Sequence, residues 1–403
     1  MIALMMRIWK NNEKPSRLKE GGIILPLLLL LSIFFGQSEK AKAQWQIMDP
    51  RMDSLVTLGA DYIYNVEFDA AEKTFNQVID LYPNHPGGHF LKSMIYWWNM
   101  QLVGMRPNLE KKFLEEIDNV LEVTDAILDT NEYDLNGLFF KGGALGYRGR
   151  YYGQKKEWYK AATDGTDALD IMEKAYKVAP TNYDIMLGKG VYNYFADAIP
   201  EKYPVAKPLL AFFPPGDKNI GLMQLKLASD KARYADIESM VLLMQVYYGF
   251  ENNYNDAYFW ANKLFTLYPG NGYFHKYIAR IYVKQGNWTK IEDEWRKILI
   301  MALDRKPGYD NMMAREACYY VGRSLFRKGN YDTALRYFAK VDEVSDYMDE
   351  EDSSYASSAL IYMGQIYMRK DKKKEARKKF QEVLEIEEWN NSHDTARKYL
   401  KKL

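Results

Sequence analysis

Small and aromatic residues recur along this chain at fixed offsets, and this spacing constrains the fold more than any other feature. Gly59 is followed twelve residues later by Ala71, and Phe75 stands four residues further on. The same residue types stand at the same offsets twice more, as Gly322, Ala334 and Phe338 and as Gly364, Ala376 and Phe380. Two helices that cross closely need a small residue at the crossing point, so the pattern predicts a series of antiparallel helix pairs.

Weaker copies of the same spacing start at Ala279 and at Gln245. The spacing resembles that of the tetratricopeptide repeat, in which each unit is a pair of helices. Pro83 and Pro269 stand where second helices must end, because proline cannot continue a helix. We therefore expect an all-α fold, a right-handed superhelical solenoid of tetratricopeptide-type helix pairs. Between residues 84 and 232 the pattern loosens, but apolar spacing still predicts helices over 89–103, 108–130, 133–152, 155–178 and 182–197.

The first 43 residues have the three parts of a secretory signal peptide. Basic residues between Arg7 and Lys19 precede the apolar run Ile23–Phe35, and Ala41-Lys42-Ala43 forms a small-x-small cleavage sequence. We expect cleavage after Ala43 and export of the protein to the periplasm or the outer membrane. An uncleaved anchor is the alternative, although a membrane-spanning helix needs about 20 apolar residues.

Two regions are expected after residues 1–43. Residues 44–232 form an N-terminal helical repeat region, with a Pro-rich insertion at 198–218 that contains Leu209, Leu210, Phe212 and Phe213. Residues 233–403 form a C-terminal tetratricopeptide array, whose last segment, 392–403, is the capping helix that solenoids need. The sequence leaves open whether the insertion is a buried plug, a lid or a membrane contact.

The middle of the chain, about residues 68–271, resembles the tetratricopeptide repeat protein 39 family. The resemblance rests on residues 187–195, which read LGKGVYNYF, and on residues 212–218, which read FFPPGDK and are followed by Gly221 and Leu222. It implies a helical repeat fold and carries over no catalytic residue. The signal peptide departs from those intracellular proteins, so their biology is not transferred to this chain.

Composition excludes several classes of function. The 55 Lys and Arg residues balance 54 Asp and Glu residues, which argues against a polybasic nucleic-acid binder. Cys318 is the single cysteine and is expected in the helical core, so no disulfide framework can form. His85 and His89 have a metal-compatible spacing, but Pro86 between them indicates a turn. The acidic run 349–352 lacks the glycine of a calcium loop. We expect no cofactor, no metal and no enzyme activity.

The first helices of such repeats line the concave surface, and their inward positions can be counted from the small crossing residue. In the carboxyl-terminal repeats this count selects six cations and one tyrosine, namely Lys276, Arg280, Lys284, Tyr319, Arg323, Arg327 and Arg369. In the first repeat it selects Val56, Ala60 and Tyr64. We therefore expect a groove that is apolar toward the amino end and cationic toward the carboxyl end. The alternative is that neighbouring Glu and Asp residues neutralise these cations.

The leading functional hypothesis is a non-catalytic protein–protein interaction scaffold of the bacterial cell envelope. It would bind a protein or peptide partner of acidic character in the concave groove, and no nucleic acid. The alternative is a carrier of an apolar, lipid-like ligand that uses the insertion residues, with peripheral membrane contact. Aromatic clusters such as Tyr96-Trp97-Trp98 and Tyr147 with Tyr151 either line a ligand groove or pack the core.

Overall fold

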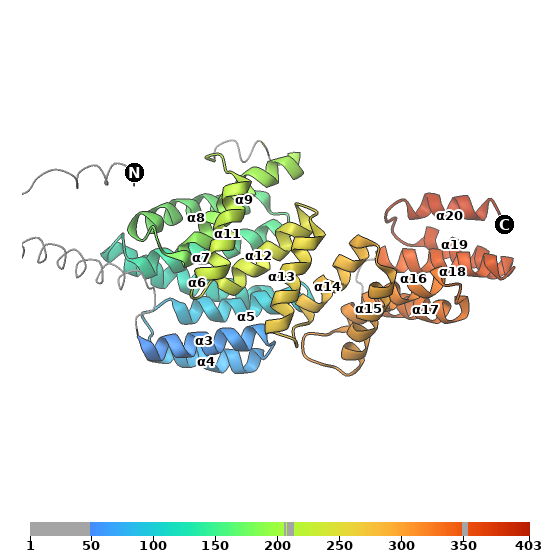
Figure 1. The fold of residues 1–403 in the computed structure, drawn as a ribbon, viewed down its shortest axis with the longest axis horizontal. Helices are drawn as coiled ribbons and strands as arrows, with labels where there is room; N and C mark the ends of the chain where they lie inside the picture. Colours follow the sequence, from blue (N-terminus) through green and yellow to red (C-terminus); the bar gives the residue numbers. More distant parts are fainter. Residues whose placement is uncertain (1–48, 205–206, 208–212, 349–353) are drawn as a thin grey trace, which may run out of the picture. The chain divides into compact units, whose positions relative to one another are not determined.

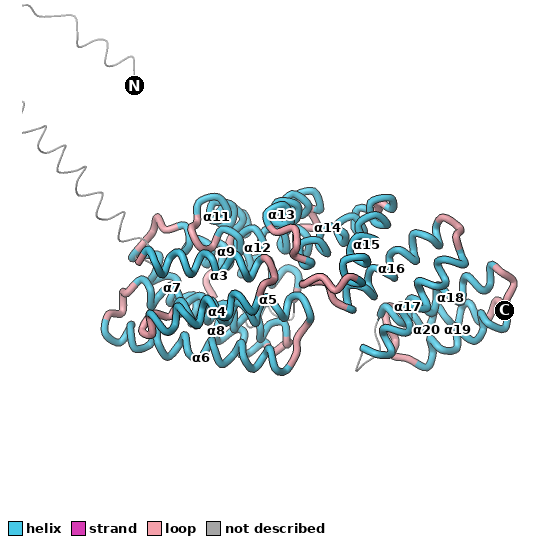
Figure 2. The backbone as a smooth tube through the Cα atoms, turned by 90° about the horizontal axis from the view of Figure 1, so that it is seen from below, coloured by secondary structure: helices cyan, strands magenta, loops and turns pink. Residues whose placement is uncertain are grey.

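The computed structural model describes residues 49–204, 207, 213–348 and 354–403. These described residues lie in one compact unit, and helices joined by loops account for all of their regular structure (Figure 2). The all-α repeat fold is therefore confirmed. Residues 1–43, which are predicted to form a signal peptide, lie outside the described residues.

The helices follow one another in antiparallel pairs (Figure 1). The first helices of the pairs are α3 (Pro50–Tyr64), α5 (Gly87–Val103), α7 (Leu135–Gln154), α9 (Tyr183–Lys202), α12 (Asp236–Gly249), α14 (Gly272–Gln285), α16 (Asn311–Arg327) and α18 (Ser354–Arg369). The second helices are α4 (Phe68–Leu81), α6 (Pro107–Thr130), α8 (Trp158–Val178), α11 (Lys218–Lys231), α13 (Tyr254–Leu267), α15 (Trp288–Leu303), α17 (Tyr331–Met348) and α19 (Lys373–Glu385). Helix α20 (Ser392–Leu400) follows the last pair, and the ring of its Tyr399 stacks on Phe380 of α19.

Short polar side chains start several of these helices. Asp49 accepts hydrogen bonds from the backbone N–H groups of Arg51 and Met52, both at 2.9 Å. Asn253 and Asn287 do the same at the start of α13 and α15, each at 3.2 Å. These side chains satisfy backbone donors that have no partner inside the helix.

The predicted crossing points are confirmed where the spacing is clearest. A Cβ atom added at Gly59 would lie 2.3 Å from Cε1 of Phe75, and one added at Gly364 would lie 2.6 Å from Cε1 of Phe380. Phe75 and Phe380 are themselves fully buried. Glycine is required at these positions because the aromatic ring of the second helix occupies the space that a side chain would need.

The crossing of α9 and α11 differs from the expectation. The sequence count places the small position at Gly188, but Gly188 faces Met172 of the preceding helix α8. The crossing instead uses Gly190, which meets Leu225, and Gly221, where an added Cβ would lie 2.5 Å from the backbone nitrogen of Tyr194. Glycine is present on both helices, and at Gly221 the backbone of α9 occupies the space of a side chain.

One expected helix boundary was wrong. Helix α9 continues through Pro200 to Lys202, so the insertion begins later than residue 198. Proline removes one donor but leaves the rest of the turn intact, and the N–H of Tyr203 donates to the carbonyl of Ile199 at 2.7 Å. The helix predicted over 133–152 agrees with α7, and the glycines at 142–146 do not interrupt it. They lie in the middle of one continuous helix.

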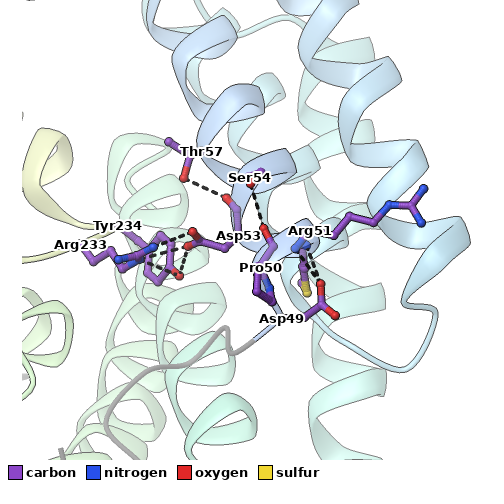
Figure 3. A network of polar contacts seen from close by, with 9 residues as sticks. Asp49, Pro50, Arg51, Asp53, Ser54, Thr57, Arg233 and Tyr234 are labelled. Atoms are coloured by element: carbon purple, nitrogen blue, oxygen red, sulfur yellow. Dashed lines mark hydrogen bonds and ion pairs between the residues drawn. The ribbon is translucent and has the colours of Figure 1, made fainter. Parts of the chain in front are cut away.

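The first helix pair contacts the fifth and sixth pairs, far along the sequence. The guanidinium of Arg233, just before α12, donates to both carboxylate oxygens of Asp53 on α3, at 3.1 and 2.5 Å (Figure 3). The hydroxyl of Tyr234 donates to the same carboxylate at 2.6 Å. The Asn271 side chain donates to the carbonyl of Tyr64 at 2.8 Å. These contacts, which we call the ring closure, make the first five pairs enclose a space.

Candidate functional site

The enclosed space is a cavity of about 380 Å³, here called the amino-terminal cavity. Its lining comes from helices α3, α5, α7, α8, α9 and α12. The larger apolar side chains that line it are Ile63, Phe90, Leu91, Met94, Phe139, Leu187, Val191, Phe195, Ile199 and Phe213. Val56, Ala60 and Tyr64 also line it, as the count from Gly59 predicts. Apolar cavities of this size with few polar groups are typical of small-molecule sites.

Two buried carboxylates line the cavity, Asp184 of α9 and Glu238 of α12. Asp184 accepts hydrogen bonds from the backbone N–H groups of Arg233, Tyr234 and Ala235, at 2.8 to 3.1 Å. Glu238 is held by side chains instead. Its Oε1 accepts hydrogen bonds from the hydroxyl of Tyr64 at 3.0 Å and from Nε1 of Trp98 at 2.8 Å. Its Oε2 accepts from the hydroxyl of Tyr147 at 2.7 Å. Burial, together with the charge of Glu238, raises the pKa of Tyr64 and Tyr147 well above the usual value, so both phenols stay protonated donors.

No Lys, Arg or His nitrogen of the described residues lies within 4.0 Å of the Glu238 carboxylate. Arg150 also lines the cavity, but its guanidinium lies over the ring of Trp97 at 4.9 Å and donates to Gln245 at 3.1 Å. Glu238 is therefore held by neutral donors alone, and its charge has no cationic partner at contact distance.

Glycines form one wall of the cavity. Gly142, Gly143, Gly146 and Gly149 lie on α7, and Gly165 lies on α8. Gly149 packs against the backbone of α8, with the carbonyl oxygen of Ala161 3.4 Å from an added Cβ. At Gly146 and Gly165 an added Cβ would meet no atom of the described residues within 4 Å. The packing of the helices therefore does not require glycine at these two positions.

The carboxyl-terminal concave surface carries the predicted cations on α14, α16 and α18. We call Lys276, Arg280, Lys284, Arg323, Arg327 and Arg369 the cationic surface. Arg280 is paired with a carboxylate, since its Nε and Nη2 donate to the two oxygens of Glu316 at 2.7 and 2.6 Å. Burial lowers the pKa of Arg280, but the charge of Glu316 and these hydrogen bonds outweigh burial and raise it.

The other five cations have no carboxylate oxygen within 4.0 Å among the described residues. Aromatic rings support most of them instead. Arg327 lies 4.6 Å from the ring of Trp288, and Arg369 lies 4.6 Å from the ring of Phe326. Lys284 is exposed. Within the described part of the chain, direct pairing with an acid, the alternative drawn from the sequence, therefore applies among these six cations to Arg280 alone.

Arg323 is the most enclosed guanidinium of this surface. It lies 5.2 to 5.9 Å from the ring centroids of four aromatic residues, Trp288, Tyr319, Tyr320 and Tyr362. Its Nε is buried and has no hydrogen-bond partner in the described part of the chain. The predicted site residue Tyr319 thus lies beside Arg323, and its ring helps to fix the direction of the guanidinium.

Lys276 is half-buried on α14, with its ammonium 5.4 Å from the ring of Tyr273. Burial, and then the neighbouring charge of Arg280, lower the pKa of Lys276 to about 8. Hydrogen bonds connect the surroundings of Lys276 with the amino-terminal cavity. Gln245 accepts a hydrogen bond from Arg150 of the cavity lining and donates one to the hydroxyl of Tyr273 at 2.7 Å.

Other residues singled out in the sequence have structural places. Cys318 is a free, buried thiol of α16, and burial raises its pKa to about 11. His89 contacts Glu116, with Nδ1 2.7 Å from the carboxylate. The described residues contain no group of three His, Cys, Asp or Glu that could hold a metal ion, and none of their helices is long and apolar enough to cross a membrane.

The insertion residues Leu209, Leu210 and Phe212 lie outside the described residues, as does the acidic run 349–352. Phe213 is half-buried and lines the amino-terminal cavity. The hydroxyl of Tyr192 donates to the carbonyl of Pro214, and an added Cβ at Gly216 would lie 2.4 Å from the carbonyl oxygen of Asn193. The end of the insertion is thus packed on α9.

Comparison with known proteins supports the repeat assignment. Residues 358–387, which cover most of α18 and α19, match the tetratricopeptide repeat family. No curated protein sequence matches the chain. The predicted resemblance to the tetratricopeptide repeat protein 39 family has no support from these comparisons.

Several solved structures resemble the chain in fold. PilF of Pseudomonas aeruginosa shares 13% sequence identity, with 61% of this chain and 92% of that chain covered and a TM-score of 0.40. PilW, a type IV pilus biogenesis factor, shares 14% identity, with 60% and 91% covered and a TM-score of 0.38. Human IFIT1, solved as a dimer with PPP-AAAA, shares 14% identity, with 80% and 69% covered and a TM-score of 0.42.

Proposed function

We propose that this protein is a non-catalytic interaction scaffold of the bacterial cell envelope, and that its cationic surface binds an acidic segment of a partner protein. One observation carries the proposal. The first helices of the carboxyl-terminal pairs present cations that have no carboxylate partner among the described residues and that lie against aromatic rings. A helical repeat presents such side chains on a continuous concave surface.

The arrangement suits carboxylates for a physical reason. A guanidinium stacked on a ring keeps its N–H edge free, so it can form paired hydrogen bonds with a carboxylate while losing little side-chain freedom. Arg323 and Arg327 share the ring of Trp288, which places two guanidinium groups side by side. An extended acidic segment that runs across α16 and α18 would meet these groups in succession.

The envelope location rests on the sequence of residues 1–43. Their basic lead, apolar run and small-x-small cleavage sequence support export, and export would place the scaffold where it could assemble other envelope proteins. Sequencing the amino terminus of the protein isolated from cells tests this part of the proposal. We expect the chain to begin at Gln44, and a terminus at Met1 would contradict cleavage.

The binding part is tested with a fluorescein-labelled peptide of six glutamates flanked by alanines, measured by fluorescence anisotropy. We expect binding that weakens as salt rises from 50 to 300 mM, because exposed charges are screened. Arg327→Glu combined with Arg369→Glu should weaken binding at least tenfold, since both side chains are exposed and have no carboxylate partner.

The matched control is Lys374→Glu combined with Arg377→Glu, which changes the net charge equally on the exposed face of the second helix α19. This control should bind the peptide as the unmodified protein does. Equal losses in the two double variants, or equal binding of a six-glutamine peptide, would contradict a specific acidic site. Tighter binding of an oligoadenylate RNA of the same charge would assign the surface to nucleic acid instead.

A further inference from the structure

We propose that the amino-terminal cavity binds a free single-chain lipid, with its alkyl chain along the glycine wall and a hydrogen-bond donor on its head group directed at Glu238. This site is separate from the cationic surface and independent of the function proposed for it. Three features of the cavity carry the inference: its enclosure, the two glycines without packing partners and the unpaired charge of Glu238.

The enclosure gives the cavity its capacity for an apolar ligand. The volume of about 380 Å³ lies inside the ring closure, which holds α3 against the start of α12. One side of the lining has large aliphatic and aromatic side chains, among them Leu91, Met94 and Val191. Helices α7 and α8 contribute the glycines and three alanines, together with larger side chains such as Phe140 and Met172. A flexible alkyl chain fits between such walls because it needs no polar partner along its length.

Gly146 and Gly165 indicate where the chain would lie. Each is inside a helix, where glycine costs about 1 kcal/mol relative to alanine. At Gly143 or Gly188 a neighbouring side chain explains the absence of a Cβ atom, but at Gly146 and Gly165 the space stays open. Both open positions line the cavity. The packing of the described residues does not explain why these two positions are glycine. A ligand that contacts the helix backbone at both positions would explain it.

Glu238 defines the head group. Three neutral donors occupy part of its capacity, and a carboxylate offers about four acceptor directions. With no cation of the described residues at contact distance, its charge favours a hydroxyl or an ammonium group and repels a carboxylate. The rings of Tyr64 and Trp98, which meet edge to face at 5.5 Å, line the same end and can contact a cationic head group.

The test is calorimetric titration of the full chain with decylamine, 1-decanol and decanoate, each below its micellar concentration. We expect decylamine and 1-decanol to bind at a ratio of one to one, and decanoate to bind at least tenfold more weakly than decylamine. Absence of binding by all three compounds would overturn the proposal. Decanoate binding as tight as that of decylamine would overturn the role of Glu238.

Two variants of α7 separate filling of the cavity from a general effect on the helix. Gly146→Leu puts a side chain into the cavity, whereas Gly153→Leu puts one into open space on the same helix outside the cavity lining. We expect Gly146→Leu to abolish decylamine binding and Gly153→Leu to retain it. Equal binding by the two variants would contradict the placement of the alkyl chain.

Glu238→Gln tests the contact with the head group, because it removes the negative charge but keeps a side chain of the same size. Its amide oxygen can still accept the hydrogen bond from Trp98. We expect the preference for decylamine over 1-decanol to fall at least fivefold while 1-decanol binding changes little. An unchanged preference would show that Glu238 does not face the head group. Circular dichroism melting curves of each variant, recorded without ligand, check that the protein still folds.

Discussion

The amino-terminal and carboxyl-terminal halves are built from the same helix pairs but present opposite kinds of surface. In the first half, the ring closure between Asp53 and Arg233 joins the ends of a cavity whose largely apolar lining contains the carboxylates of Asp184 and Glu238. In the second half, the concave side carries unpaired cations supported by aromatic rings. The repeat thus fixes the backbone arrangement, while the inward positions of the first helices determine the chemistry of each surface.

The largest expected effect concerns how the helices of a pair approach each other. Gly221→Ala should destabilise the protein by about 3 kcal/mol, because the added carbon would lie 2.5 Å from a backbone nitrogen that cannot move aside. Gly322→Ala should cost about 1 kcal/mol, since its neighbour is the Phe338 ring at 3.0 Å, which can shift. Urea unfolding measures the free energy of unfolding of both variants, and equal losses would remove the difference between the α9–α11 crossing and the α16–α17 crossing.

A smaller effect is expected from breaking the ring closure. Asp53→Ala removes the acceptor of Arg233 and Tyr234 and should cost about 2 kcal/mol. Hydrogen exchange should rise in α3 and α4 and stay unchanged in α18 and α19. Asp69→Ala is the control, because Asp69 is also an acidic residue in the first turn of a helix but takes no part in the closure. Faster exchange throughout the chain would show that the halves do not open separately.

The smallest effect is a dependence on pH that is confined to the cationic surface. Lys276 has a pKa of about 8 in the folded protein against an ordinary value of 10.5, so it loses its charge as pH rises through 8. Binding of the six-glutamate peptide should fall about threefold between pH 7 and pH 9. Between pH 8 and 10.5 the unfolded chain binds more protons at this residue, so stability should rise with pH.

In the variant Lys276→Gln, peptide affinity and protein stability should both vary less with pH than in the unmodified protein. Binding of 1-decanol in the amino-terminal cavity should not change between pH 7 and pH 9. A fall in peptide binding that persists unchanged in Lys276→Gln would assign the titration to another group.

The local fold could be predicted from the sequence because its determinants are close in the chain. The offsets from Gly59 to Phe75 and from Gly364 to Phe380 reflect direct contacts within one pair, and the structure reproduces them. The fold of the middle segment was predicted less exactly. At Gly188 and Gly190 two glycines stand two residues apart, and spacing alone cannot show which of them meets the following helix.

The sites could be predicted only in part. The inward count selected the cations of the proposed surface, but it did not select Glu316, which lies 36 residues after Arg280 and pairs with it. The cavity carboxylate Glu238 was also missed, because Asp236 and Glu238 at the start of α12 have the pattern of ordinary acidic residues in a first helical turn. The ring closure leaves no sequence signal, because Asp53 and Arg233 are 180 residues apart and follow no repeat spacing.

The ring closure also limits how this chain can change length during evolution. An open repeat array can gain or lose a unit anywhere, because each unit contacts only its neighbours. Here, deletion of a unit between α5 and α11 would carry Asp53 away from Arg233 and Tyr234 and leave their polar groups without partners. Duplications are therefore expected after α15, where added pairs would lengthen the array, and the number of pairs before that point is expected to stay constant.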